Sequence, residues 1–476
     1  MHERAFGLAD QESFARLSGD HNPIHVDPLK ARRLLFGRPV VHGIHSLLSA
    51  LDGWAATNDR AFALESLTAR FPKPIFLNQQ VTCAVTHETH DTVHIALSAN
   101  GAITVTLKFV WRGNPPGTGE APISSSPAEC EPRDPGIDEI ATCRGTLDLH
   151  LDGESARALF PNLQTRLPPD QLAVLLATTR LVGMHCPGLH SLYSDLELHW
   201  SDRPSTRSLG YAVDRFDPRL GLVRVALDGA NVAGSLRAFV LPAPRRQPGV
   251  AELKAYVDPA EFANQNALIV GGSRGLGEIT AKLLAAGGAV VTVTYRSGNE
   301  EAARVVEDIT RNGGRADSAH CDIQADLSGI TATRSPQVAF THLYYFATPP
   351  IGSTDGTNFS VPAFTTFCEF YVSGFARLVD ALRGKGLQHA FYPSTVFAEE
   401  LPNGMDEYVA AKTAGEAHCR YLRKHSRDMD IYCPRLPKLA TDQTVSLFQD
   451  SGADPVPVLL EHLRRFAMPA GERNAG

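Results

Sequence analysis

The pattern of apolar and polar residues in the second half of the chain alternates short apolar runs with helical patterns. Amphipathic stretches such as NEEAARVVEDITRNG (299–313) and EYVAAKTAGEAHCRYLRKHS (407–426) separate the runs. The apolar runs are NALIVG (266–271), AVVTVTY (289–295), HLYYFAT (342–348), HAFYPST (389–395) and MDIYCPRL (429–436). Buried strands joined by helices are typical of a parallel sheet covered on both faces. We therefore predict an α/β, doubly wound domain over residues 255–476.

Residues 1–113 and 137–242 follow a different pattern, and it occurs twice. Each segment has one helical stretch, VVHGIHSLLSALDGWAA (40–56) in the first and PPDQLAVLLATTRLVGMH (168–185) in the second. Alternating strand-like runs follow each helix, for example TVHIALSAN (92–100) and GLVRVALDG (221–229). This pattern predicts an α+β domain in which an antiparallel sheet wraps around one long helix. The repetition suggests a structural duplication.

Two stretches without apolar periodicity separate the three segments. Residues from Arg112 to Gly136 are rich in Pro, Gly and Ser, and a shorter stretch of the same kind runs from Leu241 to Gly249. Such compositions are typical of linkers. With 476 residues, the chain is also too long for a single core. The sequence therefore predicts a multidomain protein.

Composition narrows the function classes. The net charge of −7 gives no reason to expect nucleic acid or an anionic membrane as a partner. No apolar run reaches the length of a membrane span, and the first residues lack the pattern of a signal peptide. The eight cysteines are scattered and form no CxxC pair, which favours reduced thiols over disulfides or a zinc site. We expect a cytoplasmic protein that forms a homo-oligomer and holds no metal.

A glycine-rich turn follows the first strand of the third segment. Gly271, Gly275 and Gly277 lie between a strand and a helix, where glycines allow a sharp turn and let a pyrophosphate approach the helix N-terminus. The next strand ends at Arg296, at the position where an acidic residue would bind the ribose of NAD, and Arg274 lies in the turn itself. Two cations and no carboxylate favour a 2′-phosphate. The sequence therefore predicts NADP(H) as cofactor, the alternative being that Arg296 is a solvated surface charge.

Tyr408 and Lys412 lie four residues apart on a predicted helix and therefore point the same way. A lysine beside a tyrosine lowers the pKa of the phenol and lets it exchange a proton near neutrality. Ser394 or Thr395, upstream of this pair, offers a hydroxyl for a substrate carbonyl. Y-x-x-x-K spacing alone is common on helices, but together with the glycine turn it indicates a reductase site.

At this point the third segment resembles the short-chain dehydrogenase/reductase family over nearly its whole length. The resemblance implies that Tyr408 and Lys412 are catalytic, and the usual spacing of the family's serine selects Thr395, with Ser394 as the alternative. Two departures are Val270, where threonine is usual, and the loop YYFATPP (344–350), where the family has Asn-Ala-Gly. The resemblance implies cofactor contacts at Gly271, Ser273, Arg274, Gly275, Leu276, Gly277, Arg296, Asp322 (at the adenine), Ile323, Ala347, Tyr408, Lys412 and Thr441 (near the nicotinamide).

Near the N-terminus, residues 19–25 read GDHNPIH, which combines two histidines with an aspartate and a tight N-P turn. Three interpretations compete: a polar turn with an N-cap, a metal site, or an acid/base pair. The metal site is disfavoured because no third ligand follows at helical spacing. As an acid/base pair, Asp20 acts on a water or an acidic C–H, and His25 handles the second proton. Downstream, a helix begins at His42 and Gly43, and its N-terminal amides could bind the oxygen of a thioester carbonyl.

This arrangement resembles the MaoC-like, R-specific enoyl-CoA hydratase family of hot-dog folds. The family signature matches Gly19, Asp20, Asn22, Pro23, His25, Asp27, Ala31, Phe36, His42 and Gly43. The resemblance implies that Asp20 and His25 share a water, that the Gly43 N–H binds the thioester oxygen, and that Asn22 and His42 complete the substrate site.

Residues 137–242 lack that signature and are interpreted as a second, degenerate hot-dog domain. His185 and Cys186 could be catalytic, but they have no acidic partner nearby in sequence, so we expect a structural role. We expect the helix of this segment to lie antiparallel to the helix that begins at Gly43. In that position it closes the substrate tunnel from the side opposite Asp20.

Together these features predict a double hot dog followed by a Rossmann-like domain. The resemblances imply a bifunctional enzyme on an acyl thioester of CoA or acyl carrier protein, with a dehydratase (enoyl hydratase) and an NADPH-dependent 3-oxoacyl reductase. Two alternatives stay open. The reductase could act on an unrelated carbonyl, such as a polyketide or a sugar, with the hot-dog part as substrate holder. The chain could also be a non-catalytic acyl- or nucleotide-binding protein.

Overall fold

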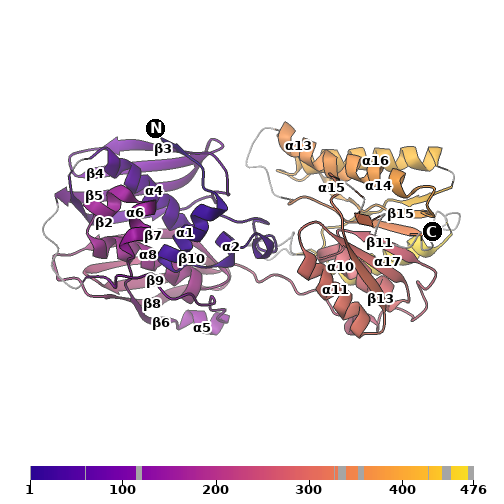
Figure 1. The fold of residues 1–476 in the computed structure, drawn as a ribbon, viewed down its shortest axis with the longest axis horizontal. Helices are drawn as coiled ribbons and strands as arrows, with labels where there is room; N and C mark the ends of the chain where they lie inside the picture. Colours follow the sequence, from indigo (N-terminus) through magenta and orange to yellow (C-terminus); the bar gives the residue numbers. More distant parts are fainter. Residues whose placement is uncertain are drawn as a thin grey trace. The chain divides into compact units, whose positions relative to one another are not determined.

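The computed structural model describes residues 2–58, 60–113, 121–325, 327, 329–330, 339–351, 359–426, 428–441 and 452–469. These residues belong to two compact units, residues 1–243 and 244–476 (Figure 1). The first unit therefore contains both predicted α+β segments, and the second contains the predicted α/β domain.

The first unit is built on one ten-stranded sheet in which every pairing is antiparallel. Its order is β1-β3-β4-β5-β2-β7-β10-β9-β8-β6. The strands are β1 (His2–Arg4), β2 (Phe62–Arg70), β3 (Val81–Glu88), β4 (Thr92–Ala99), β5 (Ala102–Gly113), β6 (Arg144–Asp148), β7 (Ser191–Trp200), β8 (Ser208–Asp217), β9 (Leu222–Gly229) and β10 (Val232–Val240). The second five strands repeat the order of the first five in reverse, as a duplication requires. We call residues 1–113 the first repeat and residues 137–242 the second repeat.

The two repeats meet where β2 pairs with β7, with a register that runs from Ser66 opposite His199 to Arg70 opposite Asp195. The helices of this unit are α1 (Leu8–Ser18), α2 (Pro23–Val26), α3 (Pro28–Ala31), α4 (Gly43–Ala56), α5 (Ile137–Ala141), α6 (Gly153–Leu159), α7 (Pro161–Arg166), α8 (Pro169–Arg180) and the π-helical turn η1 (Leu181–His185). The long helices α4 and α8 are buried over most of their surface because the sheet wraps around them. Their side chains share one hydrophobic core that spans both repeats.

The described part of the first predicted linker, residues 121–136, contacts the second repeat. The Ile123 N–H donates to the Leu149 carbonyl at 2.9 Å, and the Arg133 N–H donates to the Met184 carbonyl at 2.9 Å. Residues 241–249, the second predicted linker, form neither helix nor strand, and the next helix begins at Val250.

The second unit contains a six-stranded parallel sheet of order β13-β12-β11-β14-β15-β17. Its strands are β11 (Asn266–Val270), β12 (Val290–Tyr295), β13 (Arg315–His320), β14 (His342–Tyr345), β15 (His389–Phe391) and β17 (Asp430–Tyr432); a small pair is formed by β16 (Ser394–Thr395) and β18 (Arg435–Leu436). The helices are α9 (Val250–Leu253), α10 (Gly275–Ala286), α11 (Asn299–Arg311), α13 (Val361–Cys368), the π-helical turn η2 (Glu369–Gly374), α14 (Phe375–Leu382), α15 (Phe397–Glu400), α16 (Asp406–His425) and α17 (Pro455–Ala467).

Helices cover both faces of this sheet. One apolar core holds side chains of α10, α11 and α17, and a second core on the other face holds those of η2, α14 and α16 (Figure 1). This is the predicted doubly wound arrangement, so the fold class is confirmed for both units. In such sheets the ligand lies at the carboxyl ends of the strands. Each helix within the described residues falls short of the length and apolarity needed to cross a bilayer.

Candidate functional site

The turn that carries Asp20 and His25 is fixed by its own backbone. Helix α1 ends at Gly19, whose φ of +77° is left-handed and whose Cα lies too close to Arg180 and Pro127 for a side chain. Asn22 then caps the short helix α2, because its Oδ1 accepts from the Ile24 N–H at 3.1 Å. His25 lies on α2, so the two expected catalytic residues are brought to one place.

Asp20 is a buried carboxylate with two hydrogen bonds. Its Oδ2 accepts from the Thr179 hydroxyl at 2.6 Å, and its Oδ1 accepts from the Asn22 N–H at 3.3 Å. Burial raises the pKa of Asp20, and the neighbouring His25 and the Thr179 hydroxyl partly counter that rise. A carboxyl group whose pKa is raised holds a proton more readily than a solvated one, which suits a group that exchanges protons.

His25 is oriented by the backbone. Its Nδ1 lies 2.8 Å from the Val40 carbonyl, which can only accept, so Nδ1 carries the proton and Nε2 presents a lone pair. Burial lowers the pKa of His25, while Asp20 raises it. A neutral imidazole with a free Nε2 can take a proton from a water.

His42 lies against His25, with ring centroids 3.8 Å apart. Its Nδ1 is 2.9 Å from Gln11 Oε1, and its Nε2 is 3.0 Å from the Asp20 carbonyl. Burial lowers the pKa of His42 well below its usual range. Gly43 follows as the first residue of α4, and the helix leaves the amide of its first residue without an intrahelical acceptor. That N–H is the predicted oxyanion donor.

Asn22 was predicted in the substrate site, but the structure uses its amide differently. The side-chain nitrogen donates to the Gly183, Gly188 and Leu189 carbonyls at 2.9, 3.2 and 3.1 Å. All three carbonyls belong to the second repeat. Asn22 is buried and joins the catalytic turn to that repeat, so its side-chain donors are already engaged.

The second repeat forms part of the Asp20 environment, which the sequence did not predict. Thr179 lies in the last turn of helix α8 next to the carboxylate, and a Cβ placed on Gly183 would collide with Asp20 Oδ1. The prediction that this helix closes the site from the side opposite Asp20 is therefore wrong. The sequence offered one weak signal, the polar run Thr178–Arg180 within an otherwise apolar helix.

His185 and Cys186 do not join the Asp20 group. Burial lowers the pKa of His185, and the nearest charges are Arg180 and Arg133. Cys186 is buried beside Cys143, and burial raises the pKa of its thiol. Neither side chain bonds to Asp20, His25 or His42 in the contacts of the described residues.

Among the described residues, Asp20, His25 and His42 form a group whose possible metal-ligating atoms lie within 4.8 Å of one another. Each of these three residues has a hydrogen-bond partner in the protein. Our prediction that no metal is required stays a prediction.

In the second unit, the glycine turn has the geometry expected of a dinucleotide site. Gly271 has φ +77° and lies against the backbone of Phe346, and Gly277 packs against the Gly271 carbonyl so closely that no Cβ fits. Gly275 has φ +59°, and the space where its Cβ would lie is open. Helix α10 begins at Gly275, with Arg274 at the N-cap position. The residues thus leave room at a helix N-terminus for a phosphate.

The remaining predicted cofactor residues lie at the same edge of the sheet, because each follows a strand end. Arg296, just after β12, is exposed, and its guanidinium bonds Gln324 at 3.3 Å. Asp322 accepts from the Gln324 N–H at 3.0 Å. Ser273, Ile323 and Thr441 are buried, whereas Leu276 and Ala347 are half-buried.

The two candidates for the reductase hydroxyl, Ser394 and Thr395, have different surroundings. The Ser394 hydroxyl donates to Glu416 Oε1 at 2.6 Å, and that carboxylate also binds Arg435. The Thr395 hydroxyl instead lies near the Tyr408 phenol and partly offsets the rise in the pKa of Tyr408 that burial causes. This geometry favours Thr395 over Ser394 as the hydroxyl that acts with Tyr408.

Lys412 contacts the Pro393 carbonyl and the ring of Tyr371. Its Nζ donates to the Pro393 carbonyl at 2.8 Å and lies 4.1 Å from the centroid of the Tyr371 ring. Burial lowers the pKa of Lys412 to about 8 and raises the pKa of Tyr408 to about 12. The expectation that Lys412 lowers the pKa of Tyr408 is therefore not met in this structure. Tyr371, on the π-helical turn η2, was missed because its position depends on that turn.

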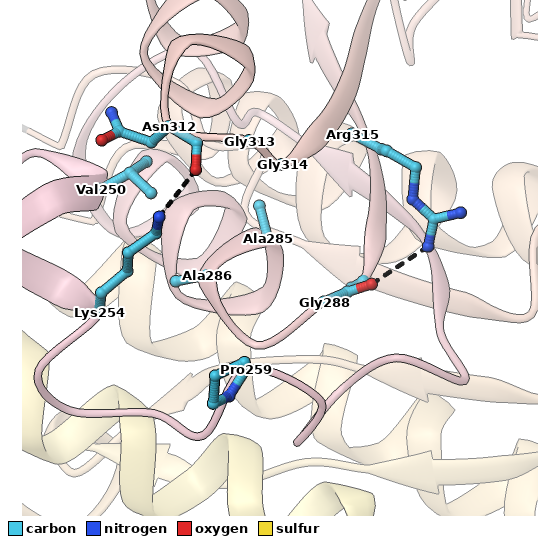
Figure 2. Close-up of a pocket in the computed structure, with 11 residues that line it drawn as sticks. Val250, Lys254, Pro259, Ala285, Ala286, Gly288, Asn312, Gly313, Gly314 and Arg315 are labelled. Carbon is cyan, nitrogen blue, oxygen red and sulfur yellow. Dashed lines mark hydrogen bonds between the residues drawn. The ribbon is translucent and has the colours of Figure 1, made fainter.

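A separate cavity of about 300 Å³ lies in this unit (Figure 2). Lys254 donates to the Asn312 carbonyl at 2.8 Å, and Arg315 donates to the Gly288 carbonyl at 3.3 Å. Gly288 and Arg315 stand at the amino ends of β12 and β13, so the cavity lies at the edge of the sheet opposite Gly271. It is distinct from the predicted dinucleotide site.

These two sites define the class of protein as a hot-dog hydratase-type fold joined to a dinucleotide-binding fold. Residues 2–106 match the MaoC like domain family, and residues 265–338 match the short chain dehydrogenase family. The chain therefore carries a MaoC-like domain at its N-terminus and a short-chain dehydrogenase domain further along. Both resemblances, and the pairing of a hydro-lyase family with an oxidoreductase family, are confirmed.

Curated relatives match parts of the chain. They include the (R)-specific enoyl-CoA hydratase of Aeromonas caviae, 40% identical over 85 residues (17% of this chain, 62% of that protein). The 3-hydroxyacyl-thioester dehydratase Y of Mycobacterium tuberculosis is 36% identical over 84 residues (16% and 27%). The peroxisomal hydratase-dehydrogenase-epimerase of Saccharomyces cerevisiae is 38% identical over 68 residues (14% and 7%). The chain thus spans less than two thirds of each relative.

Solved structures similar to this chain include a putative short chain dehydrogenase from Escherichia coli complexed with NADPH, with a TM-score of 0.41 and 16% identity over 46% of this chain and 95% of that one. A dehydrogenase/reductase from Sinorhizobium meliloti has a TM-score of 0.39 and 22% identity over 43% and 90%.

Proposed function

We propose that the chain is a bifunctional enzyme acting on acyl thioesters of CoA or acyl carrier protein. Its first unit interconverts 3-hydroxyacyl and trans-2-enoyl forms, and its second unit interconverts 3-oxoacyl and 3-hydroxyacyl forms with NADP(H). The observation that carries the proposal is the pairing of the buried Asp20 with the half-buried His25 beside the N-terminus of α4.

In the hydratase reaction, Asp20 and His25 act on one water. The Asp20 carboxylate takes or returns one proton, and His25 Nε2 handles the other, because its Nδ1 is held by Val40. The Gly43 N–H would bind the thioester oxygen, where negative charge develops when the α-carbon loses its proton. The activities for which the Aeromonas caviae hydratase and the Mycobacterium tuberculosis dehydratase are named fit this substrate class.

In the reductase reaction, Tyr408 would donate the proton to the carbonyl oxygen. A phenol with a pKa of about 12 is protonated at neutral pH, and the Thr395 hydroxyl beside it would hold the same oxygen. The turn of Gly271, Gly275 and Gly277 would hold the pyrophosphate of NADP(H), with Arg274 and Arg296 near the 2′-phosphate. NADP(H) supplies or accepts the hydride.

We also propose that the first and second repeats act as one catalytic unit. Their strands share a sheet, their helices share a core, and Asn22 and Asp20 bond directly to the second repeat. The domains 1–113 and 137–242 are therefore halves of a double hot dog, and residues 255–476 form the reductase.

The test is to incubate the protein with acetoacetyl-CoA and NADPH, and separately with crotonyl-CoA. In the first mixture we expect NADPH to be oxidised and 3-hydroxybutyryl-CoA to form, which absorbance and mass spectrometry measure. In the second mixture we expect the enoyl absorbance to be lost. Failure of both reactions would refute the proposed function.

A further inference from the structure

We propose that Thr179, which the second repeat supplies, is a positioning residue of the hydratase and that its hydroxyl holds the Asp20 carboxylate in its working orientation. The second repeat is then part of the catalytic centre and not only a support. This inference rests on the proposed hydratase function and names a residue that acts through Asp20.

The contact between the two side chains is short and closed to solvent. The Thr179 hydroxyl donates to Asp20 Oδ2 at 2.6 Å, and Thr179 and Asp20 are 3% and 1% exposed. A hydroxyl has one proton to donate, so Thr179 commits its proton to the carboxylate. Hydrogen bonds from a hydroxyl to an ionised carboxylate are short and strong, and this bond stabilises the charged form of Asp20.

The backbone around Thr179 is shaped to bring it to the carboxylate. Helix α8 passes directly into the π-helical turn η1 after Arg180. Turns of this kind are rare and often occur at functional sites. Within η1, Gly183 lies so close to Asp20 Oδ1 that any side chain would displace the carboxylate, and its carbonyl accepts from Asn22. The second repeat therefore constrains both carboxylate oxygens.

The other groups near Asp20 leave Thr179 as the principal side-chain donor. His25 on α2, His42 at the start of α4 and His21 in the turn are the titratable groups that face it. His42 Nε2 lies 3.9 Å from Oδ2, beyond hydrogen-bond distance. From the second repeat, Arg180 passes beside Gly19 but directs its guanidinium to the Asp148 carbonyl. Removal of the Thr179 hydroxyl would leave Oδ2 without its hydroxyl donor.

The experiment compares three variants of the full chain. Thr179→Val removes the hydroxyl with little change of shape, and Thr179→Ser keeps it. Thr178→Val is the matched control, because the neighbouring Thr178 is equally buried but donates to the Leu175 carbonyl at 2.8 Å within its own helix. For each protein, the rate of crotonyl-CoA hydration is measured from pH 5 to pH 9, together with the melting temperature.

We expect Thr179→Val to lower kcat at pH 7 by about 10-fold or more and to move the acid limb of the pH profile up by about one unit, the effect expected when an ionised group loses a hydrogen bond. The rate should recover as the pH rises, because Asp20 then ionises without the Thr179 hydroxyl. Thr179→Ser should restore the wild-type profile, and Thr178→Val should leave the limb in place. An unchanged limb in Thr179→Val, or an equal shift in Thr178→Val, would overturn the proposal.

A measurement without substrate tests the contact between Thr179 and Asp20 separately from the proposed hydratase reaction. The carboxylate stretch of Asp20, obtained as the infrared difference between wild type and Asp20→Asn, can be titrated in the wild-type and Thr179→Val backgrounds. We expect the midpoint to rise in Thr179→Val. If the wild-type protein does not hydrate crotonyl-CoA but the midpoint still rises, the proposed reaction fails and the positioning contact stands. If the midpoint does not move, the positioning role fails whatever the activity.

Discussion

Two side chains, the buried Asp20 and the half-buried Tyr408, carry the protons in the proposed reactions, and each belongs to a different unit. Asp20→Asn removes the proton acceptor without a change of size, so we expect crotonyl-CoA hydration to fall by about 10³-fold or more while acetoacetyl-CoA reduction is retained. Tyr408→Phe should have the opposite effect. Each variant is the folding control for the other. Near wild-type reduction in Tyr408→Phe would show that the reductase site is misassigned.

Cofactor choice depends on the cations near the glycine turn. Arg274 and Arg296 predict that NADPH binds at least about 10-fold more tightly than NADH, or about 1.4 kcal/mol, a modest effect for two charge-assisted contacts. Arg296→Ala should reduce this ratio. Arg304→Ala, which removes an exposed cation from α11, should not. Both dissociation constants can be measured by the quenching of protein fluorescence, and equal affinities in the wild type would contradict the prediction.

His45 gives the first unit a dependence on pH that is separate from catalysis. It is fully buried among Phe6, Phe14 and Phe160, and neither ring nitrogen has a hydrogen-bond partner among the described residues. Burial lowers the pKa of His45 well below 6.5. Below pH 6.5 the unfolded chain therefore binds a proton that the folded chain does not, and stability is lost as the pH falls.

We expect His45→Phe to remove this loss. The free energy of unfolding of the variant, relative to wild type, should increase by up to about 1.4 kcal/mol for each pH unit below 6.5. The difference at pH 8, where the imidazole is neutral in both states, reports the packing change alone. Urea unfolding at pH 8, 6.5 and 5.5 measures both. A difference that does not depend on pH would show that His45 is protonated in the folded state.

The sequence predicts the individual helices and strands better than it predicts the contacts between distant elements. Alternation marked most strands of both repeats, and the spacing of Gly271, Gly275 and Gly277 located the start of α10. The motif from Gly19 to His25 also brought Asp20 and His25 together as expected. These signals are local, since each arises from residues a few positions apart.

The contacts that the sequence did not predict join distant residues. Thr179 is 159 positions from Asp20, and nothing in its spacing refers to that residue. The pairing of β2 with β7 also joins distant residues. The alternation within each strand does not specify which other strand it pairs with. Lys412 shows a third case: helical spacing put it on the face of Tyr408, but the Pro393 carbonyl and the Tyr371 ring determine where Nζ lies.

The pairing of β2 with β7 predicts how the first unit can be divided. Residues 1–113 alone would expose the edge of β2 and part of the shared core, so we expect this fragment to be insoluble or to self-dimerise. Residues 1–243 should be soluble and should hydrate crotonyl-CoA without binding NADPH. Size-exclusion chromatography and the hydration assay test both statements. A monomeric, active 1–113 fragment would contradict the role given to the second repeat.

In the whole molecule, the two proposed reactions share the 3-hydroxyacyl thioester, which is the product of the reductase and the substrate of the dehydratase. Because one chain carries both sites, an intermediate released at one site meets the other site at a raised effective concentration. Sharing requires that both sites handle the same stereoisomer at carbon 3. That requirement can be tested without structural information, because Asp20→Asn and Tyr408→Phe each leave one site intact.

We expect wild-type protein to convert acetoacetyl-CoA and NADPH into a mixture that contains crotonyl-CoA. Asp20→Asn should stop at 3-hydroxybutyryl-CoA, and Tyr408→Phe should not react. An equimolar mixture of the two variants should reach the same final composition as wild type, because the intermediate released by one chain is a substrate for the other. Chiral analysis of the 3-hydroxybutyryl-CoA that accumulates with Asp20→Asn provides the control. If the mixture and the wild type both stop at this compound while crotonyl-CoA is hydrated in a separate assay, the sites use opposite stereoisomers and do not share an intermediate.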